Sequence, residues 1–520
     1  KQFSSSSFNL IEVIVLMMLM NVFGSLPSPF MGFGAPPAVP RGPLMMTSPT
    51  AELQPGAEVV LGQHKFRALQ ILGRGSFSTV WAAVRSDGGG EVAIKETLCH
   101  SPQDLQDAES ECKLLKMVGN AALRTPGFLA CETTRLHSGV ISVRLAMTKV
   151  PGDLIEVFLQ QWQKQCIGDS ASEFIEACNF TYELLVQLVP TFDAMSRVVL
   201  HRDINAHNLL VSMGGSGSSP QFSIIDFGLA IDIHKWQTVL TSVPVVGDCR
   251  YWPASAWYIF LHGGPKLMEM QSLFMEYKTQ LDLHAFGITA LQVFIDMLPK
   301  QSMRAADATI PEHILDLKAA WDQYWQDAYQ LWEPLYKAFE RKTDLNTLRQ
   351  SYIAKEAHNV IDEDLGRLRR ALCNARDAFA GAEPGSKMVV IFAVLAELIS
   401  QGTKPLGREA AQTSIKLASW RDIAMLLNST SVAAMRCDSV GNRASTTTVP
   451  GPTPSSTTLP VPIKNKHHGI TSTVPFSYVP TPHRAVHGRL AKSPSAVCFP
   501  TVVMSGAPTI SQRSFMPNLR

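Results

Sequence analysis

The first part of the chain alternates short apolar runs with glycine-rich turns, a pattern typical of β-strands. Ile71–Trp81 is predicted to form a strand, a turn and a second strand, and Glu91–Lys95 a further short strand. Apolar residues then recur every three to four positions, which predicts a helix with one buried face. That face holds Leu105, Ala108, Cys112, Leu115 and Val118.

Three further short strands and a polar loop follow, and then a long helical segment. Val198–Val211 has apolar ends around a polar loop, and Phe222–Gly228 is a strand that ends near Asp226. Within residues 296–385, apolar and aromatic residues recur at helical spacing: Ile314, Leu317, Trp321, Trp325, Tyr329, Trp332, Tyr336 and Phe339. Such a stripe packs on its own domain or docks a partner. We favour packing, because aromatic stripes are most often core.

The two ends of the chain differ from this body. Val13–Met20 is a short apolar run, interpreted either as part of a secretory signal segment or as an apolar stretch of no function. Residues 25–57 are rich in Pro and Gly and are predicted to be a linker. Residues 431–520 are rich in Ser, Thr and Pro, so they bury too little apolar area to fold and are predicted to be disordered.

Composition excludes several classes of protein. Apolar residues make up 46% of the 520 residues, enough for a sizeable core, yet no apolar run reaches the length of a membrane span. Nine cysteines without a CxxC pair indicate neither a zinc ribbon nor a disulfide scaffold. The net charge of +2 comes from the tail, where residues 438–520 hold eight basic residues and one acidic residue. The body is therefore acidic, and we expect no nucleic-acid binding and no stable membrane span.

A glycine-rich turn and a lysine suggest binding of an anion. Gly73 and Gly75 allow the backbone to approach phosphates, although a plain hairpin turn can have the same sequence pattern. Lys95 ends a strand, and Glu111 on the following helix can point toward it. Glu109 competes for that contact. Glu111 is preferred because two leucines follow it at +3 and +4, and the alternative is a surface ion pair of little energetic value.

A second group of polar residues suits proton and metal chemistry. Asp203 and Asn208 stand five residues apart in one loop, as expected of a proton acceptor beside a metal ligand. Asp226 comes at the end of an apolar strand, a usual position for a ligand of a hard cation.

Four motifs, in order, resemble the signature of the eukaryotic protein kinases: the glycine-rich loop, EVAIK, HRDINAHN and IDFG. The resemblance extends from about residue 66 to about residue 430. It implies an α+β, two-lobed protein-kinase-like fold, with a β-rich N-lobe at residues 58–150 and a helical C-lobe at residues 151–430. By the same resemblance, Asp282 would brace the catalytic loop, and Arg408 would be the structural arginine of the closing helices.

The resemblance implies ATP and Mg²⁺ as cofactors and a serine/threonine side chain of a protein as substrate. Residues at seven positions would cover the ATP phosphates or surround the adenine: Leu72, Gly73, Gly75, Val80, Ala93, Met147 and Leu210. Lys95, held by Glu111, would contact the α- and β-phosphates. Asn208 and Asp226 would hold Mg²⁺, and Asp203 would accept or orient the proton of the substrate hydroxyl.

Three positions in the catalytic and docking loops depart from the family pattern. Asn205 replaces a lysine, Asp248 replaces a threonine, and Ser255 stands where a glutamate pairs with the structural arginine. We expect Asn205 to donate a hydrogen bond to Asp248, and His207 or Arg250 to supply the missing positive charge. The alternatives to an active protein kinase are a nucleotide-binding pseudokinase that acts as an allosteric scaffold, and a small-molecule kinase.

The candidate signal segment, the altered docking loop and the long insertion also resemble the secreted rhoptry kinases of apicomplexan parasites. That resemblance implies passage through the secretory pathway, and the alternative is a cytoplasmic protein.

Overall fold

The computed structural model describes residues 52–75, 78–119, 121–165, 170–214, 219–239, 245–299, 310–340, 345–400 and 417–428. The candidate signal segment, Arg408 and the Ser/Thr/Pro-rich tail lie outside the described residues. Within these ranges, no helix has both the length and the apolar character needed to cross a membrane.

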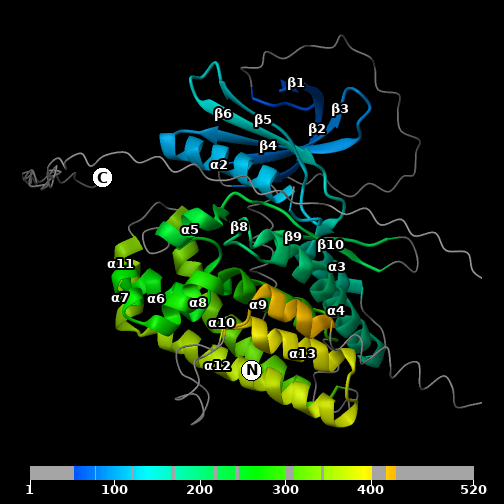
Figure 1. Cartoon of the computed structure of the whole chain (residues 1–520), viewed down its shortest axis with the longest axis vertical. Coiled ribbons are helices and arrows are strands. Elements are labelled where there is room, and N and C mark those ends of the chain that lie inside the picture. Colours follow the sequence, from blue (N-terminus) through cyan, green and yellow to red (C-terminus); the bar gives the residue numbers. More distant parts are fainter. Residues whose placement is uncertain are drawn as a thin grey trace, which may run out of the picture. The chain divides into compact units, whose positions relative to one another are not determined.

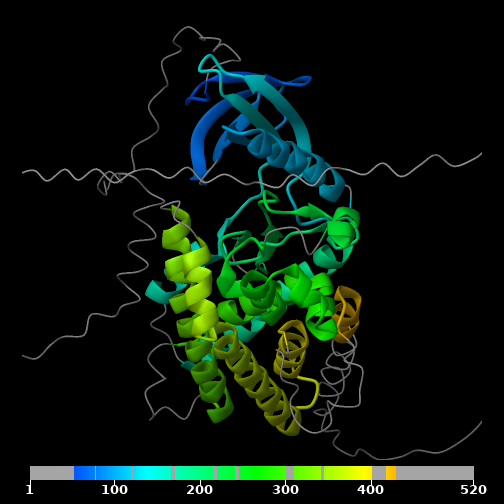
Figure 2. The ribbon, with the colours of Figure 1, turned by 90° about the vertical axis from the view of Figure 1, so that its left-hand side faces the viewer.

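The N-terminal region is built on an antiparallel sheet with the strand order β1-β2-β3-β4-β6-β5. The strands are β1 (Glu58–Leu61), β2 (His64–Arg74), β3 (Ser78–Arg85), β4 (Glu91–Cys99), β5 (Phe128–Arg135) and β6 (Ile141–Thr148). Helix α2 (Pro102–Gly119) lies along the sheet in contact with β4, β5 and β6, as Figures 1 and 2 show. The predicted helix and strands are therefore confirmed in this region.

Helix α2 begins where two residues cap each other. The backbone N–H of Asp104 donates to the Ser101 hydroxyl at 3.1 Å, and the N–H of Ser101 donates to the Asp104 carboxylate at 2.9 Å. This reciprocal arrangement satisfies donors that the first turn of a helix leaves unpaired. The buried face carries Leu114, Leu115 and Val118, and it also carries the charged Glu111.

The opposite face of the sheet has its own small core, which includes Phe66 and Trp81. Leu53 and Ala57 are buried in it, so the folded N-terminal region includes residues before the boundary predicted at residue 58. Here Glu96 of β4 and Arg144 of β6 form a buried ion pair at 2.8 Å, opposite each other in the ladder.

A disulfide joins Cys112 of α2 to Cys131 of β5. Nothing in the sequence indicates this bond, because the two cysteines form no CxxC pair and become neighbours only when the helix packs on the sheet. The bond ties the helix that carries Glu111 to an edge strand.

The C-terminal region is mainly helical, with short strands close to its start. The strands are β7 (Asp153–Leu154), β8 (Val199–Leu200), β9 (Leu209–Ser212), β10 (Gln221–Ile224) and β11 (Ile231–Asp232). The helices before the insertion are α3 (Ile155–Gln165), α4 (Ser170–Met195), α5 (Ile233–Val239), the 3₁₀ helix η1 (Cys249–Tyr251), α6 (Ala254–His262), α7 (Gly264–Met268), α8 (Gln271–Thr279) and α9 (Leu281–Asp296). Strands β9 and β10 pair antiparallel and hold the loops of the predicted site at their ends.

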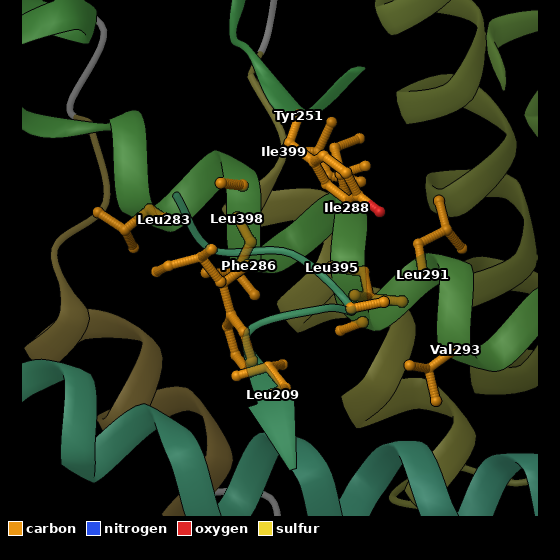
Figure 3. Packing of buried hydrophobic residues seen from close by; sticks show 14 of the residues in the cluster. Leu209, Tyr251, Leu283, Phe286, Ile288, Leu291, Val293, Leu395, Leu398 and Ile399 are labelled. Atoms are coloured by element: carbon orange, nitrogen blue, oxygen red, sulfur yellow. The ribbon is translucent and has the colours of Figure 1, made fainter. Parts of the chain in front are cut away.

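Helix α9 is buried on nearly every side, and most of its residues from Asp282 to Ile295 are apolar. It packs against α4 and against α13 (Lys387–Leu398). A Cβ atom at Gly287 would lie 2.8 Å from Cβ of Leu398, so glycine permits this close approach. Figure 3 shows residues of this core, including Leu209 of β9 and Tyr251 of η1, gathered around α9 and α13.

The predicted insertion forms three helices that pack back on the C-terminal region. They are α10 (Glu312–Glu340), α11 (Leu345–Ala354) and α12 (Ala357–Ala382). Ile314, Leu317 and Trp321 of the apolar stripe are buried, which confirms the packing interpretation for this part of the stripe. Tyr336, further along, is 40% exposed. Helices α10 and α12 lie along one another, and α10 also contacts η1.

Candidate active site

Three charged side chains from distant parts of the chain meet at Lys95. The ammonium of Lys95 lies 2.7 Å from the carboxylate of Glu111 and 2.7 Å from that of Asp226. The preference for Glu111 over Glu109 is confirmed, since Glu109 instead accepts a hydrogen bond from the Thr133 hydroxyl at 3.4 Å. The site is therefore assembled from β4, α2 and the loop that follows β10.

Burial and mutual charge set the protonation of this cluster. Burial alone would lower the pKa of Lys95, but the two carboxylates outweigh it and raise the pKa. Burial would raise the pKa of Asp226, and Lys95 reverses this so that the pKa is lowered. Burial dominates at Glu111, whose pKa is raised. The lysine thus stays charged, and the Asp226 side chain, which is 49% exposed, offers an ionised carboxylate.

The loop that carries Asp203 is held by Asp282 of α9, as predicted. The carboxylate of Asp282 accepts hydrogen bonds from the backbone N–H of His201 at 2.7 Å and of Arg202 at 2.8 Å. Arg202 has a φ of 66°, a conformation rare outside glycine that these bonds help to maintain.

The carboxylate of Asp203 accepts three hydrogen bonds. The side-chain amides of Asn205 and Asn208 donate at 2.9 Å and 2.8 Å, and the backbone N–H of Asp248 donates at 3.3 Å. Burial raises the pKa of Asp203 to about 6, with smaller contributions from the charges of Asp248 and Asp226. A carboxylate in this state is oriented and can accept a proton near neutral pH.

The expectation that Asn205 bonds to Asp248 is wrong. The amide of Asn205 turns back to Asp203, and its oxygen accepts from the backbone N–H of His207 at 2.9 Å. The carboxylate of Asp248 is instead paired with Arg250, whose Nε lies 3.0 Å from both carboxylate oxygens. Arg250 can reach this carboxylate because it stands only two residues after Asp248. His207 is engaged elsewhere, 2.7 Å from Glu156.

The predicted metal ligands stand at the end of one pair of strands. The backbone N–H of Ile225, the neighbour of Asp226, donates to the carbonyl of Asn208 at 2.9 Å. This bond continues the ladder between β9 and β10 and brings the two ligand positions to the same end of it. An amide oxygen and a carboxylate are donors that suit Mg²⁺, so the residues fit that cation.

A family model described as protein kinase domain matches residues 66–363. This chain belongs to the protein kinase domain family. Its relatives include Serine/threonine-protein kinase dkf-1 of Caenorhabditis elegans, 27% identical over 224 residues, which are 42% of this chain and 26% of the relative.

Two further relatives are also kinases by name. Mitogen-activated protein kinase kinase kinase 2 of Arabidopsis thaliana is 26% identical over 198 residues, or 36% of this chain and 27% of the relative. Mitogen-activated protein kinase KSS1 of Saccharomyces cerevisiae is 24% identical over 235 residues, or 43% of this chain and 55% of the relative. The matched region of this kinase chain thus spans between about a quarter and about half of the relatives' lengths.

The residues predicted to surround the adenine lie on both regions of the kinase domain. Gly73 pairs with Val80, and Ala93 pairs with Met147, on adjacent strands of the N-terminal sheet. Leu72 at the end of β2 is 45% exposed, which leaves an apolar side chain free to cover a flat apolar ligand. Leu210 lies on β9. Gly75 ends the described part of the turn, because residues 76 and 77 lie outside it.

The end of the docking loop has an anchor that the sequence did not indicate. The backbone N–H of Ser255 donates to the carboxylate of Glu276 on α8 at 2.9 Å, and the hydroxyl of Ser400 also bonds to Glu276. A glutamate in an amphipathic helix gives no signal of this role. Glu276 thus holds this segment of the kinase domain at Ser255, the position where the family has a glutamate.

Proposed function

We propose that this chain is an active protein kinase that transfers the γ-phosphoryl group of ATP to serine or threonine hydroxyls of a protein. The observation that carries the proposal is the simultaneous pairing of Lys95 with Glu111 and with Asp226. The ion pair between this lysine and the glutamate of the following helix is in place in active protein kinases. Membership in the protein kinase domain family supports the same reaction class.

Each charged group has a task in this reaction. Lys95 supplies a fixed positive charge for the α- and β-phosphates, and Glu111 holds it in place. Asn208 and Asp226 would hold Mg²⁺, which neutralises charge on the phosphates when it is bound. Asp203, oriented by its three hydrogen bonds, accepts the proton of the attacking hydroxyl. The protein contributes mainly position and charge, since phosphoryl transfer demands little else.

Serine/threonine specificity is supported by the names of two relatives. Serine/threonine-protein kinase dkf-1 carries that activity in its name, and so does Serine/threonine-protein kinase pakH of Dictyostelium discoideum, 22% identical over 241 residues. We extend the specificity to this chain as part of the proposal.

A pseudokinase that binds nucleotide is the second candidate. The observation that favours it is the setting of Asp203, which has the neutral amide of Asn205 where the family has a lysine, and the acid Asp248 beside it. In that function the chain would keep its nucleotide site and lose transfer.

Two measurements on the full chain separate the candidates. Incubation with radiolabelled ATP and Mg²⁺ is followed by detection of label on the chain itself and on myelin basic protein. Thermal unfolding with and without ATP then reports binding. We expect label that is lost in Asp203→Ala and Asp226→Ala, and ATP stabilisation that is lost in Lys95→Ala. Stabilisation by ATP without label on either protein would favour the pseudokinase or the small-molecule kinase over the protein kinase.

The narrower kinship with rhoptry kinases and the route through the secretory pathway stay predictions from the sequence. The test of the route is direct. Residues 1–57 fused to a reporter would carry it into the secretory pathway of a eukaryotic cell, whereas a reporter that stays in the cytoplasm would contradict the prediction.

A further inference from the structure

Arg250 is a buried cation enclosed by side chains from two separate parts of the chain. Its guanidinium pairs with the carboxylate of Asp248 and lies over the ring of Trp332, 4.3 Å from the ring centroid. Trp325 is 5.3 Å away on the same side of α10. The pair with Asp248 outweighs the effect of burial and raises the pKa of Arg250, which stays charged. A buried charge is stable only when it is paired in this way.

Helix α10 also holds the backbone of Arg250. The hydroxyl of Tyr324 donates to the carbonyl of Arg250 at 2.7 Å, and Tyr324 is fully buried. The side chain and the main chain of Arg250 are therefore both fixed by the inserted helix. Contacts between α10 and η1, which contains Arg250, agree with this arrangement.

The loop held by Arg250 touches the catalytic loop. The backbone N–H of Asp248 donates to the carboxylate of Asp203. Gly247 has a φ of 83°, and a Cβ atom there would lie 2.4 Å from the carbonyl oxygen of Arg202. Residues 247 and 248 thus fit closely against Asp203, and a movement of the loop would move a hydrogen-bond donor away from that carboxylate.

We propose that Arg250 is a positioning residue through which the inserted helix α10 orients Asp203 and the loop that docks the protein substrate. This inference rests on the proposed kinase activity. Helix α10 would then act on the active site in addition to packing against the C-terminal region. Through Trp332 and Tyr324 it stabilises a segment in which Asp248 and Ser255 replace the family residues.

The chemistry of Arg250 calls for a guanidinium. A planar fork can reach both oxygens of Asp248 while its face lies on an indole, whereas a lysine ammonium is a point charge that cannot do both. Arg250→Lys therefore keeps the positive charge and removes the planar fork. Trp332→Leu removes the ring against which the guanidinium lies, and Trp332→Phe keeps an aromatic ring there.

The test measures steady-state kinetics of the full chain with ATP, Mg²⁺ and myelin basic protein, together with hydrogen exchange of residues 245–253. Tyr336→Leu is the matched control, because it removes a more exposed aromatic ring of the same helix that stacks on Trp332, with 5.0 Å between the ring centroids, and leaves Trp332 itself in place. Arg250→Lys and Trp332→Leu should lower kcat for the protein substrate at least about tenfold, since small displacements of reacting groups cost that much or more. The KM for ATP should change by less than about twofold, because Lys95 and Asp226 are untouched. Trp332→Phe should recover most of the rate.

Exchange of residues 245–253 should be faster in Arg250→Lys and Trp332→Leu, and unchanged in Tyr336→Leu. Wild-type kinetics in both variants would overturn the inference. So would a loss of ATP binding that matches the loss of rate, because it would mean general destabilisation. If the wild-type chain transfers no phosphoryl group, the proposed function fails. The exchange data then decide the role of Arg250, and unchanged exchange in both variants would overturn it as well.

Discussion

The side-chain amide of Asn205 donates to the carboxylate of Asp203 at 2.9 Å, in the position where related kinases place a lysine. The same amide group accepts from the backbone N–H of His207, so it is locked in one orientation. A neutral donor therefore orients the predicted proton acceptor in this chain.

Removing that donor should slow phosphoryl transfer. Asn205→Ala loses one hydrogen bond to Asp203, worth about 1 kcal/mol, which corresponds to roughly a fivefold drop in kcat. Asn205→Lys, which again offers a donor to the same oxygen, should retain more activity than Asn205→Ala. Steady-state kinetics check both variants, and an unchanged rate in Asn205→Ala would show that the bond is dispensable.

Gly247 should be required for activity beyond its effect on folding. Gly247→Ala puts a Cβ atom 2.4 Å from the carbonyl oxygen of Arg202 at a positive φ. Gly263→Ala is the matched control, since its φ of 86° is strained in the same way and its nearest atom, on Pro265, is 3.9 Å away. We expect the larger loss of stability in Gly247→Ala, because the clash adds to the strain of the positive φ, and a loss of transfer in that variant alone, measured by thermal unfolding and kinase assay. Equal activities in the two variants would contradict the close fit of this loop.

The buried pair between Glu96 and Arg144 should be essential for the stability of the N-terminal sheet. Glu96 also accepts from the backbone N–H of Leu53 at 3.2 Å, so it joins three segments. Arg144→Met leaves Glu96 charged and unpaired, and should lower the free energy of unfolding by about 3–5 kcal/mol. The double variant with Glu96→Gln should recover part of this loss in urea denaturation. A loss below about 1 kcal/mol in Arg144→Met, the value typical of surface pairs, would contradict the burial of this pair.

Reduction of the Cys112–Cys131 disulfide should lower stability as well. The two cysteines are 19 residues apart, and a loop of that size predicts a contribution of about 3 kcal/mol. A reductant should therefore lower the Tm of the wild-type chain and leave that of Cys112→Ser/Cys131→Ser unchanged. The free thiols at Cys99, Cys178 and Cys249 are present in both proteins and serve as an internal control. Equal Tm values of the wild-type chain with and without reductant would rule out the bond.

The core around α9 should weaken in acid through His284. This imidazole is fully buried and accepts from the backbone N–H of Ser400 at 2.9 Å, and burial lowers its pKa to about 3. The unfolded chain binds the proton first as the pH falls below about 6.5. The contribution of the neutral imidazole to the free energy of unfolding is therefore complete above that pH. It declines by about 1 kcal/mol per pH unit toward pH 3. His284→Gln should show a shallower decline between pH 7 and pH 5 in urea denaturation, and equal slopes would contradict this.

The sequence predicted the charged pairs that local periodicity determines. Glu111 could be chosen over Glu109 because helical spacing decides which residue of α2 faces the sheet. The contacts of Asn205 and Arg250 could not be predicted, since two donors and two acids within a few residues allow several pairings. The role of Glu276 and the contact of Trp332 with Arg250 depend on how α8 and the inserted helix α10 pack. Periodicity predicts which face of a helix is buried, but not which residues that face will contact.

The most direct test of the account compares the full chain with Asp203→Asn in transfer of phosphate from ATP and Mg²⁺ to myelin basic protein. Mass spectrometry of the product identifies the modified residues. The account predicts phosphoserine or phosphothreonine with the wild-type chain and a rate at least about a hundredfold lower with Asp203→Asn, because that variant keeps the shape of the side chain and removes its basicity. Equal transfer by both proteins, or none by the wild type, would contradict an active kinase that uses Asp203.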